Sequence, residues 1–274
     1  MLALVAGAGR LPAILAARLA ASGDRWRLCA AEGALPDFAA PDHVFRVERL
    51  AGFFAELREA GVDEICFAGA MQRPRIDPAQ LDDATRPMIG RIAAAMQAGD
   101  DGTLRALLAL VEEAGFAVRA AHEVAPDLLP EPGCLTAARP DERDRSDAAR
   151  GAAIVAALGA ADVGQACVVA QGQALAVEAL PGTDAMLAAV AALDPRLRPD
   201  PARGRGVLVK GPKPGQDRRV DLPTVGPDTV RAAAGAGLAG LAVEAGGVLL
   251  LDRDRALELA DAAGIFLWVR EAGG

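Results

Sequence analysis

The chain has 274 residues, of which 52% are hydrophobic and 3% aromatic, and it carries a formal net charge of −8. This length allows one large domain or two ordinary ones, with alanine, valine and leucine supplying most of the core. The acidic balance argues against a nucleic-acid-binding protein, although a local basic cluster can still bind an anionic substrate.

The first 125 residues alternate between strand and helix patterns, which indicates a parallel sheet covered by helices. Strands are predicted at 2–6, 26–30, 44–47, 64–68 and 116–119, and helices at 11–21, 50–60, 85–98 and 103–114. Over 126–144 the composition shifts to Pro, Glu, Arg and Asp, which favours a linker. The sequence therefore predicts an N-terminal Rossmann-like domain at 1–125 and a C-terminal domain at 145–274.

The C-terminal part has a different pattern, in which helices alternate with pairs of strands. Ser146 is a candidate N-cap for a helix ending near residue 158, and strands at 166–170 and 174–178 flank a hairpin turn. A second pair of strands, at 238–244 and 248–251, flanks a Gly-Gly turn. A helix at 253–263 and a strand at 265–269 follow, so we expect a mixed α/β domain with hairpins.

No secretory signal begins the chain, and no apolar run reaches the roughly 18 residues that a transmembrane helix needs. The sequence thus predicts a cytoplasmic protein, with a peripheral membrane contact left open. The four cysteines are scattered and form no C-x-x-C pair, which favours buried, reduced thiols.

The segment best suited to chemistry runs from Lys210 to Thr229, between a strand pattern and a helix pattern. It holds two lysines, two arginines and three aspartates among prolines and glycines. A polar loop fixed between two buried elements is where catalytic groups tend to lie. Lysine and arginine suit a phosphate group, and aspartate suits a metal ion or an attacking water molecule. The alternative is a solvated charged loop, which would not usually need so many prolines.

Two turns in the N-terminal part offer further contacts. Gly7 and Gly9 lie between a predicted strand and helix, as in a nucleotide-binding turn, but Pro12 replaces the third glycine of the dinucleotide fingerprint. Tight-turn geometry is the alternative explanation for both glycines. Gln72 and Arg73 follow a predicted parallel strand, at the sheet edge where ligands bind. A solvated arginine is the alternative there.

Two helix starts carry acidic residues. Asp100 and Asp101 precede a predicted helix, where capping by Asp101 or Thr103 is the default explanation and Mg²⁺ binding is the alternative. Thr183 and Asp184 open another helix, where capping competes with anion binding at backbone N–H groups. The two histidines have neither metal-site nor triad spacing, and no serine or cysteine lies in a nucleophile-elbow context.

Taken together, these motifs resemble those of the LpxI-type UDP-2,3-diacylglucosamine pyrophosphatases, in the family's order and over nearly the whole chain. They are G-A-G-R-L-P at 7–12, A-G-A-M-Q-R-P at 68–74, G-D-D-G-T-L-R at 99–105, A-H-E-V at 121–124, D-V-G-Q at 162–165, V-E-A-L-P-G-T-D at 177–184 and K-G-P-K-P-G-Q-D-R-R-V-D-L-P-T-V-G at 210–226. The family's usual triple glycine near the start is Gly7-Ala8-Gly9 here.

The resemblance implies hydrolysis of UDP-2,3-diacylglucosamine to UMP and 2,3-diacylglucosamine 1-phosphate (lipid X), an early step of lipid A synthesis in Gram-negative bacteria. It also implies two α/β domains with the ligand in a cleft between them, dependence on Mg²⁺, and attack of water on the sugar-side phosphorus. A lipid-linked nucleotide-sugar substrate implies transient contact with the inner-membrane surface. A homodimer is left open as the oligomeric state.

The family's essential aspartate falls on Asp221, which is expected to hold the metal or position water with help from Asp100 or Asp101. Lys213 and Arg218 are expected to clamp the diphosphate during catalysis. The other expected substrate contacts are Gly7, Gly9, Gln72, Arg73, Thr183, Asp184, Lys210, Gln216 and Thr224. Two alternatives stay open: a non-catalytic nucleotide-sugar or lipid-binding protein, and a nicotinamide-dependent oxidoreductase, against which Pro12 argues.

Overall fold

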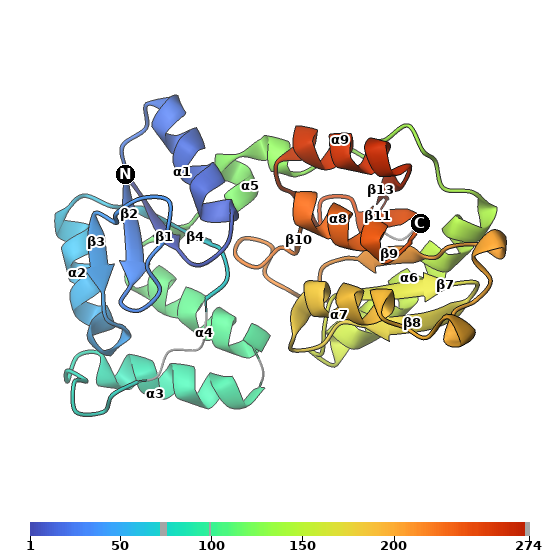
Figure 1. Ribbon diagram of the computed structural model, residues 1–274. Coiled ribbons are helices and arrows are strands. Elements are labelled where there is room, and N and C mark those ends of the chain that lie inside the picture. The colour runs from blue at the N-terminus through green and yellow to red at the C-terminus, as the bar shows by residue number, and fades with distance from the viewer. Residues whose placement is uncertain (72–75, 99, 272–274) are drawn as a thin grey trace. The chain divides into compact units, whose positions relative to one another are not determined.

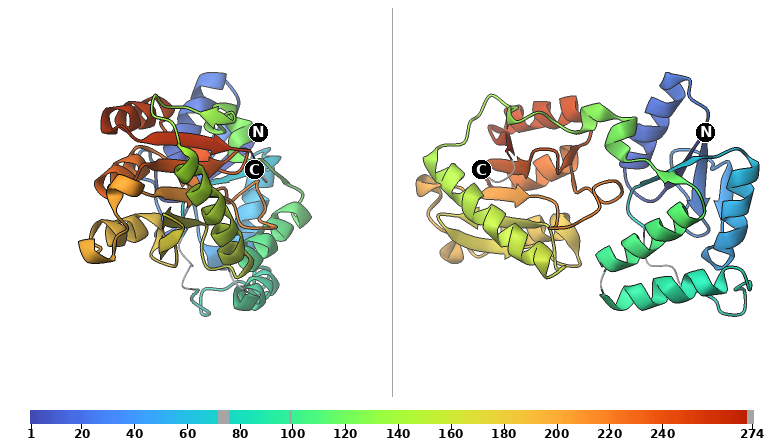
Figure 2. Two further views of the ribbon diagram at one scale, coloured as in Figure 1. Left: turned by 90° about the vertical axis from the view of Figure 1, so that its right-hand side faces the viewer. Right: turned by 180° about the vertical axis from the view of Figure 1, so that it is seen from behind.

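The computed structural model describes residues 1–71, 76–98 and 100–271, and for residues 98, 100 and 101 it describes the backbone alone. Gln72 and Arg73, both predicted substrate contacts, lie outside the described residues. The chain divides after Pro126 into two compact units, each built from strands and helices (Figures 1 and 2). The predicted α/β fold class is therefore confirmed.

The N-terminal unit is built on a five-stranded parallel sheet with the order β3-β2-β1-β4-β5. The strands are β1 (Leu2–Ala6), β2 (Trp26–Ala31), β3 (His43–Phe45), β4 (Glu64–Ala68) and β5 (Ala117–Val118). All residues of β1 are buried, as expected for a central parallel strand with helices on both faces. The strand order reverses between β1 and β4, and the Rossmann-like parallel sheet is confirmed.

Three helices of this unit begin within one residue of the predicted positions, one begins earlier than predicted, and a short helix at 121–124 was not predicted. They are α1 (Leu11–Ser22), α2 (Leu50–Glu59), α3 (Arg86–Ala95), α4 (Asp100–Glu113) and α5 (Ala121–Val124), with short 3₁₀ turns η1 (Val47–Arg49), η2 (Met96–Ala98) and η3 (Pro126–Leu128). α4 begins three residues before its predicted start at 103. Asp100 and Asp101 therefore lie inside α4 rather than before it. They occupy its first turn, where acidic residues are favoured.

The C-terminal unit contains a six-stranded mixed sheet with the order β6-β13-β11-β9-β7-β8. The three strands β9, β11 and β13 run parallel, whereas β6, β7 and β8 pair antiparallel with their neighbours. Their bounds are β6 (Gly133–Cys134), β7 (Ala166–Ala170), β8 (Gln173–Val177), β9 (Val207–Lys210), β11 (Gly240–Glu244) and β13 (Phe266–Arg270). Two short strands, β10 (Thr224–Val225) and β12 (Leu249–Leu250), form a separate parallel pair. In sequence they alternate with β9, β11 and β13.

Helices cover both faces of this sheet (Figures 1 and 2). They are α6 (Glu142–Ala160), α7 (Gly182–Ala191), α8 (Pro227–Gly235) and α9 (Arg253–Ala263), with 3₁₀ turns η4 (Pro195–Leu197) and η5 (Pro201–Arg203). α6 packs on one face with Val209, whereas Leu208 lies in the core beneath α7, α8 and α9. A Cβ atom on Gly151 of α6 would lie 2.4 Å from Cγ2 of Val209, so this glycine lets the helix approach the sheet closely.

The predicted linker is corrected at two points. The strand β6, inside the 126–144 segment, pairs antiparallel with β13, so this stretch belongs to the second sheet. α6 is capped by Asp141, whose carboxylate accepts a hydrogen bond from the N–H of Asp144 at 2.8 Å. The carboxylate of Asp144 accepts in turn from the backbone N–H of Asp141 at 3.1 Å, so the two residues form a capping box. Ser146 lies within the helix and not at its start.

One of the two predicted hairpins is present. β7 and β8 pair antiparallel, and Gln171 and Gly172 at the turn both have positive φ angles. The second hairpin prediction is wrong, because β11 pairs with β9 and β13 while β12 pairs with β10. Gly247 serves a different purpose: a Cβ atom there would lie 2.7 Å from Cδ of Pro212. Gly247 thus allows close packing against the loop after β9.

The cysteines are free thiols, as the sequence predicts. Burial raises the pKa of Cys29, Cys66 and Cys167 to about 12, so these thiols are not reactive near neutral pH. No helix in the described part of the chain combines the length and apolar composition that a membrane span requires.

Candidate active site

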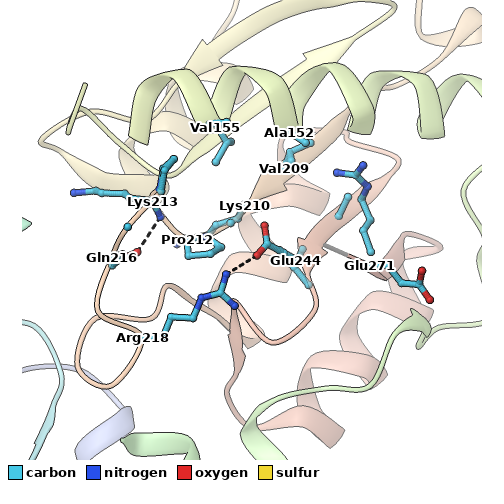
Figure 3. A pocket seen from close by; sticks show the side chains of 17 residues that line it. Ala152, Val155, Val209, Lys210, Pro212, Lys213, Gln216, Arg218, Glu244 and Glu271 are labelled. Carbon is cyan, nitrogen blue, oxygen red and sulfur yellow. Dashed lines mark hydrogen bonds and ion pairs between the residues drawn. The ribbon is translucent and has the colours of Figure 1, made fainter. Parts of the chain in front are cut away.

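A pocket of about 260 Å³ lies at the carboxyl ends of β9, β11 and β13, within the C-terminal unit (Figure 3). This is the edge at which parallel α/β sheets bind ligands. Ala152 and Val155 of α6 form an apolar wall, and the loop 211–216, which includes Lys213 and Gln216, forms a second wall. Cationic and acidic residues also border the pocket, namely Lys210, Lys213, Arg218, Arg270, Glu244 and Glu271.

Gln216 braces the loop that follows β9. Its Oε1 accepts a hydrogen bond from the backbone N–H of Lys213 at 2.9 Å. Its Nε2 donates to Oδ2 of Asp221 at 2.5 Å and also to the backbone carbonyl of Asp221. Gln216 is buried, whereas Asp221 is exposed. One buried amide therefore holds an exposed carboxylate in place, and Gln216, predicted as a substrate contact, lies in the structure as a brace of the loop.

Lys213 ties the same loop to the end of α6. Its Nζ donates to Oδ1 of Asp162 at 2.6 Å, and the two side chains are 16% and 27% exposed. Asp162 has a φ angle of 53°, in the left-handed region that non-glycine residues rarely adopt. A Cβ atom on Gly159 would lie 2.7 Å from Cδ of Pro214, so α6 and the loop are in close contact. The ion pair and this packing together fix the base of the loop.

A double-mutant cycle on Asp162→Asn and Lys213→Met should give a coupling energy of about 1 kcal/mol, because the pair is partly shielded from water. Urea unfolding of the wild type, both single variants and the double variant measures it. The exposed pair Asp194–Arg196 is the matched control and should couple by less than about 0.5 kcal/mol. Equal coupling in the two pairs would contradict a special role for the Lys213 pair.

Arg218 is held on one side by Glu244 at the end of β11. Its Nη2 donates to Oε1 of Glu244 at 3.1 Å (Figure 3). Its Nη1 donates to the carbonyl of Gly246 at 3.2 Å. The guanidinium group is half exposed, and these bonds use two of its five N–H donors. A planar cation fixed in this way suits bidentate binding of a phosphate group.

A buried polar chain joins β9 to the start of α7. Nζ of Lys210 donates to Oγ1 of Thr183 at 2.8 Å, and that hydroxyl donates to Oε1 of Glu178 at 2.9 Å. Oε2 of Glu178 accepts from the backbone N–H of Gln165 at 3.1 Å. Burial lowers the pKa of Lys210, and the negative charges of Glu178 and Asp184 oppose this effect.

The glycines after β1 are explained by backbone geometry. Ala8 and Ala70 exchange both backbone hydrogen bonds, at 2.8 and 2.9 Å, which joins the loops after β1 and β4. A Cβ atom on Gly7 would lie 2.5 Å from the carbonyl oxygen of Ala70. Gly9 has open space around it but a φ angle of 96°. The alternative of tight-turn geometry thus accounts for both, and a ligand role for Gly7 and Gly9 stays a prediction.

The structure gathers many of the predicted site residues in the C-terminal unit. Lys210, Lys213, Gln216 and Arg218 border the pocket. Hydrogen bonds link two further predicted residues to this group, Thr183 to Lys210 and Asp221 to Gln216. Asp184 lies in the first turn of α7, and Thr224 pairs with Leu249 in the small sheet. Asp100 and Asp101 belong to the N-terminal unit.

Sequence reasoning missed three carboxylate partners of these groups, Asp162, Glu178 and Glu244, and two further residues that border the pocket, Arg270 and Glu271. Two of them lie in recognised motifs: Asp162 begins D-V-G-Q, and Glu178 is the second residue of V-E-A-L-P-G-T-D. Those motifs were the available signal. The other three lie at strand ends with no local motif to mark them.

The residues described do not form a complete metal site by themselves. Among them, no three His, Cys, Asp or Glu side chains gather closely enough to hold a metal ion. Mg²⁺ is commonly bound by one or two protein carboxylates together with substrate phosphates and water. The exposed carboxylate of Asp221 is suited to supply one such ligand, and the assignment of Mg²⁺ stays a prediction.

Comparison with known proteins identifies the family. The model of the LpxI N-terminal domain matches residues 1–128, and the model of the LpxI C-terminal domain matches residues 131–268. Over 270 residues the chain is 37% identical to a Caulobacter vibrioides protein named UDP-2,3-diacylglucosamine pyrophosphatase LpxI, covering 97% of this chain and 96% of that relative. The boundary between the two family models lies close to the division of the structure after Pro126. The chain belongs to the LpxI family.

Proposed function

We propose that this protein hydrolyses the pyrophosphate bond of UDP-2,3-diacylglucosamine to UMP and 2,3-diacylglucosamine 1-phosphate. The name of the Caulobacter relative supports this activity, and the match to that relative extends over nearly the full length of the chain. The structural observation that carries the proposal is the brace of Asp221: the buried Gln216 amide donates to the exposed Asp221 carboxylate and to the Asp221 backbone carbonyl, and it accepts from the backbone N–H of Lys213. A carboxylate fixed in this way, on the loop that also carries Lys213 and Arg218, suits phosphoryl transfer to water.

The reaction can be written with the side chains of this loop. Asp221 orients a water molecule and accepts a proton from it as the water oxygen bonds to the sugar-side phosphorus. The bond between that phosphorus and the bridging oxygen breaks, and the bridging oxygen leaves with UMP. Lys213 and Arg218 stabilise the negative charge on the phosphoryl oxygens. The carboxylate partners of both cations keep them in position until substrate binds.

Dependence on Mg²⁺ is part of the proposal. When bound, the ion would supply positive charge beside the phosphate oxygens, and Asp221 is the described residue best suited to hold it. Asp100 and Asp101 are the other proposed ligands. Removing divalent ions with a chelator should abolish turnover, and adding Mg²⁺ should restore it. Full activity in the presence of excess chelator would contradict this part of the proposal.

The function is tested by incubating the purified protein with UDP-2,3-diacylglucosamine and Mg²⁺ and measuring UMP by chromatography. UMP and the lipid phosphate should form in equal amounts. The alternative, a non-catalytic nucleotide-sugar or lipid-binding protein, predicts thermal stabilisation by the same compound with no UMP and no effect of chelator. Because the proposed substrate carries two acyl chains, we also propose transient contact with the membrane surface, which flotation with phospholipid vesicles containing the substrate tests.

A further inference from the structure

Glu178 occupies the buried end of the polar chain that leads to Lys210. Both residues are buried: Glu178 is 8% exposed and Lys210 is 7% exposed. The carboxylate is held from the other side by the backbone N–H of Gln165. A Cβ atom on Gly164 would lie 2.3 Å from the carbonyl oxygen of Glu178, so the backbones are in close contact here too. Glu178 is therefore a fixed point in the C-terminal unit.

The direction of each hydrogen bond in the chain follows from chemistry. An ionised carboxylate can only accept, so the single hydroxyl hydrogen of Thr183 points to Glu178. The lone pairs of that hydroxyl are then left to accept from the Lys210 ammonium group, as observed. Glu178 thus sets the orientation of Thr183, and Thr183 sets the position of Lys210.

Glu178 also supplies negative charge near the buried Lys210 ammonium group. The groups that face Lys210 across the sheet, Ala166 of β7 and Val243 of β11, are apolar. The charged groups that act on Lys210 are Glu178 after β8 and Asp184 in α7, and both raise its pKa against the effect of burial. A buried ammonium group without a negative partner is costly, so Glu178 favours the protonated form.

We propose that Glu178 is a positioning residue of the hydrolysis: through Thr183 it keeps Lys210 protonated and fixed at the base of the loop that carries Asp221. This inference rests on the function proposed above. An ammonium group has three N–H donors, and among the described residues Thr183 is the acceptor of one. Lys210 also borders the pocket, at the point where β9 ends and the loop 211–216 begins.

The test is the pH profile of kcat/KM for Glu178→Gln. Loss of the carboxylate charge removes a contribution that raises the pKa of Lys210, so Lys210 should lose its proton at lower pH. We expect the alkaline limb of the profile to move to lower pH by about one unit and kcat/KM at neutral pH to fall about tenfold. Thr183→Val, which removes the linking hydroxyl, should move the limb in the same direction. The exposed Glu258→Gln is the matched control and should leave the profile unchanged.

An arginine in place of Lys210 separates a positioning role from a structural one. Arginine does not lose its proton in this pH range, so Glu178→Gln should not move the limb in a Lys210→Arg background. A shift that persists in that background, or an unmoved limb in the single variant, would overturn the proposal.

A measurement without substrate keeps this inference separate from the proposed function. The loss of unfolding free energy caused by Glu178→Gln should shrink as the pH rises above neutrality towards 10.5, the ordinary pKa of lysine. The reason is that neutral Lys210 no longer needs a counter-charge. A loss that does not change with pH would overturn the coupling between Glu178 and Lys210, whether or not the wild type hydrolyses the substrate.

Discussion

Asp221→Ala should lower the rate of UMP release about a thousandfold, in the range expected for loss of a group that orients and deprotonates water. The fold should survive the change, because Asp221 is exposed and its side chain bonds to Gln216 within the same loop. We expect the free energy of unfolding to stay within about 1 kcal/mol of the wild type. Initial rates of UMP release together with urea unfolding measure both quantities.

The matched control for this variant is Asp228→Asn in the same segment. Asp228 is exposed at the start of α8, pairs with Arg231 and is not among the residues that border the pocket. Its activity should stay within about twofold of the wild type, as for most surface substitutions. Asp221→Ala with more than a tenth of the wild-type rate would remove Asp221 from the chemistry. Asp221→Asn then shows whether the charge or the hydrogen bond to Gln216 matters more.

Gly7→Ala should destabilise the N-terminal unit by about 3 kcal/mol or more, because the new methyl group meets backbone that cannot move easily. The Cβ atom would lie 2.5 Å from the carbonyl oxygen and 2.9 Å from the carbonyl carbon of Ala70. Relieving this overlap means breaking the paired hydrogen bonds between Ala8 and Ala70. Thermal or urea unfolding measures the effect.

Two other glycines give the scale for this result. Gly9→Ala meets no atom within 4 Å but keeps a positive φ angle, so it should cost roughly 1–2 kcal/mol. Gly52→Ala lies in α2 with open space around it and should stabilise the protein by about 0.5–1 kcal/mol. If Gly7→Ala were as stable as the wild type and only substrate binding were weakened, the glycine would be a ligand contact and not a packing requirement.

The sequence was sufficient where a helix or strand pattern had clear ends. The strand at 64–68 and the helix at 253–263 were predicted with the bounds that the structure shows, since glycine follows each of them directly. It was insufficient where the structure depends on a distant partner. The Gly246-Gly247 turn looked like a hairpin, and only the pairing of β11 with β9 and β13 shows otherwise. The strand β6 is two residues long and exists through its pairing with β13.

The same distinction holds for the site. Lys210, Lys213, Gln216 and Arg218 lie in one segment and were found from its composition. Their partners come from elsewhere in the chain: Lys213 and Asp162 are 51 positions apart, and Lys210 and Thr183 are 27 apart. Local patterns carry no information on such contacts. Gln216 is an example: its hydrogen bonds to Lys213 and Asp221 brace the loop, which composition did not indicate, and its predicted contact with substrate stays a prediction.

The central claim is that this protein cleaves the substrate pyrophosphate by attack of water on the sugar-side phosphorus. Hydrolysis of UDP-2,3-diacylglucosamine in H₂¹⁸O, followed by mass spectrometry of both products, tests it most directly. We predict one ¹⁸O atom in 2,3-diacylglucosamine 1-phosphate and none in UMP. Absence of UMP above the rate without protein would contradict the activity, and ¹⁸O in UMP would contradict the site of attack.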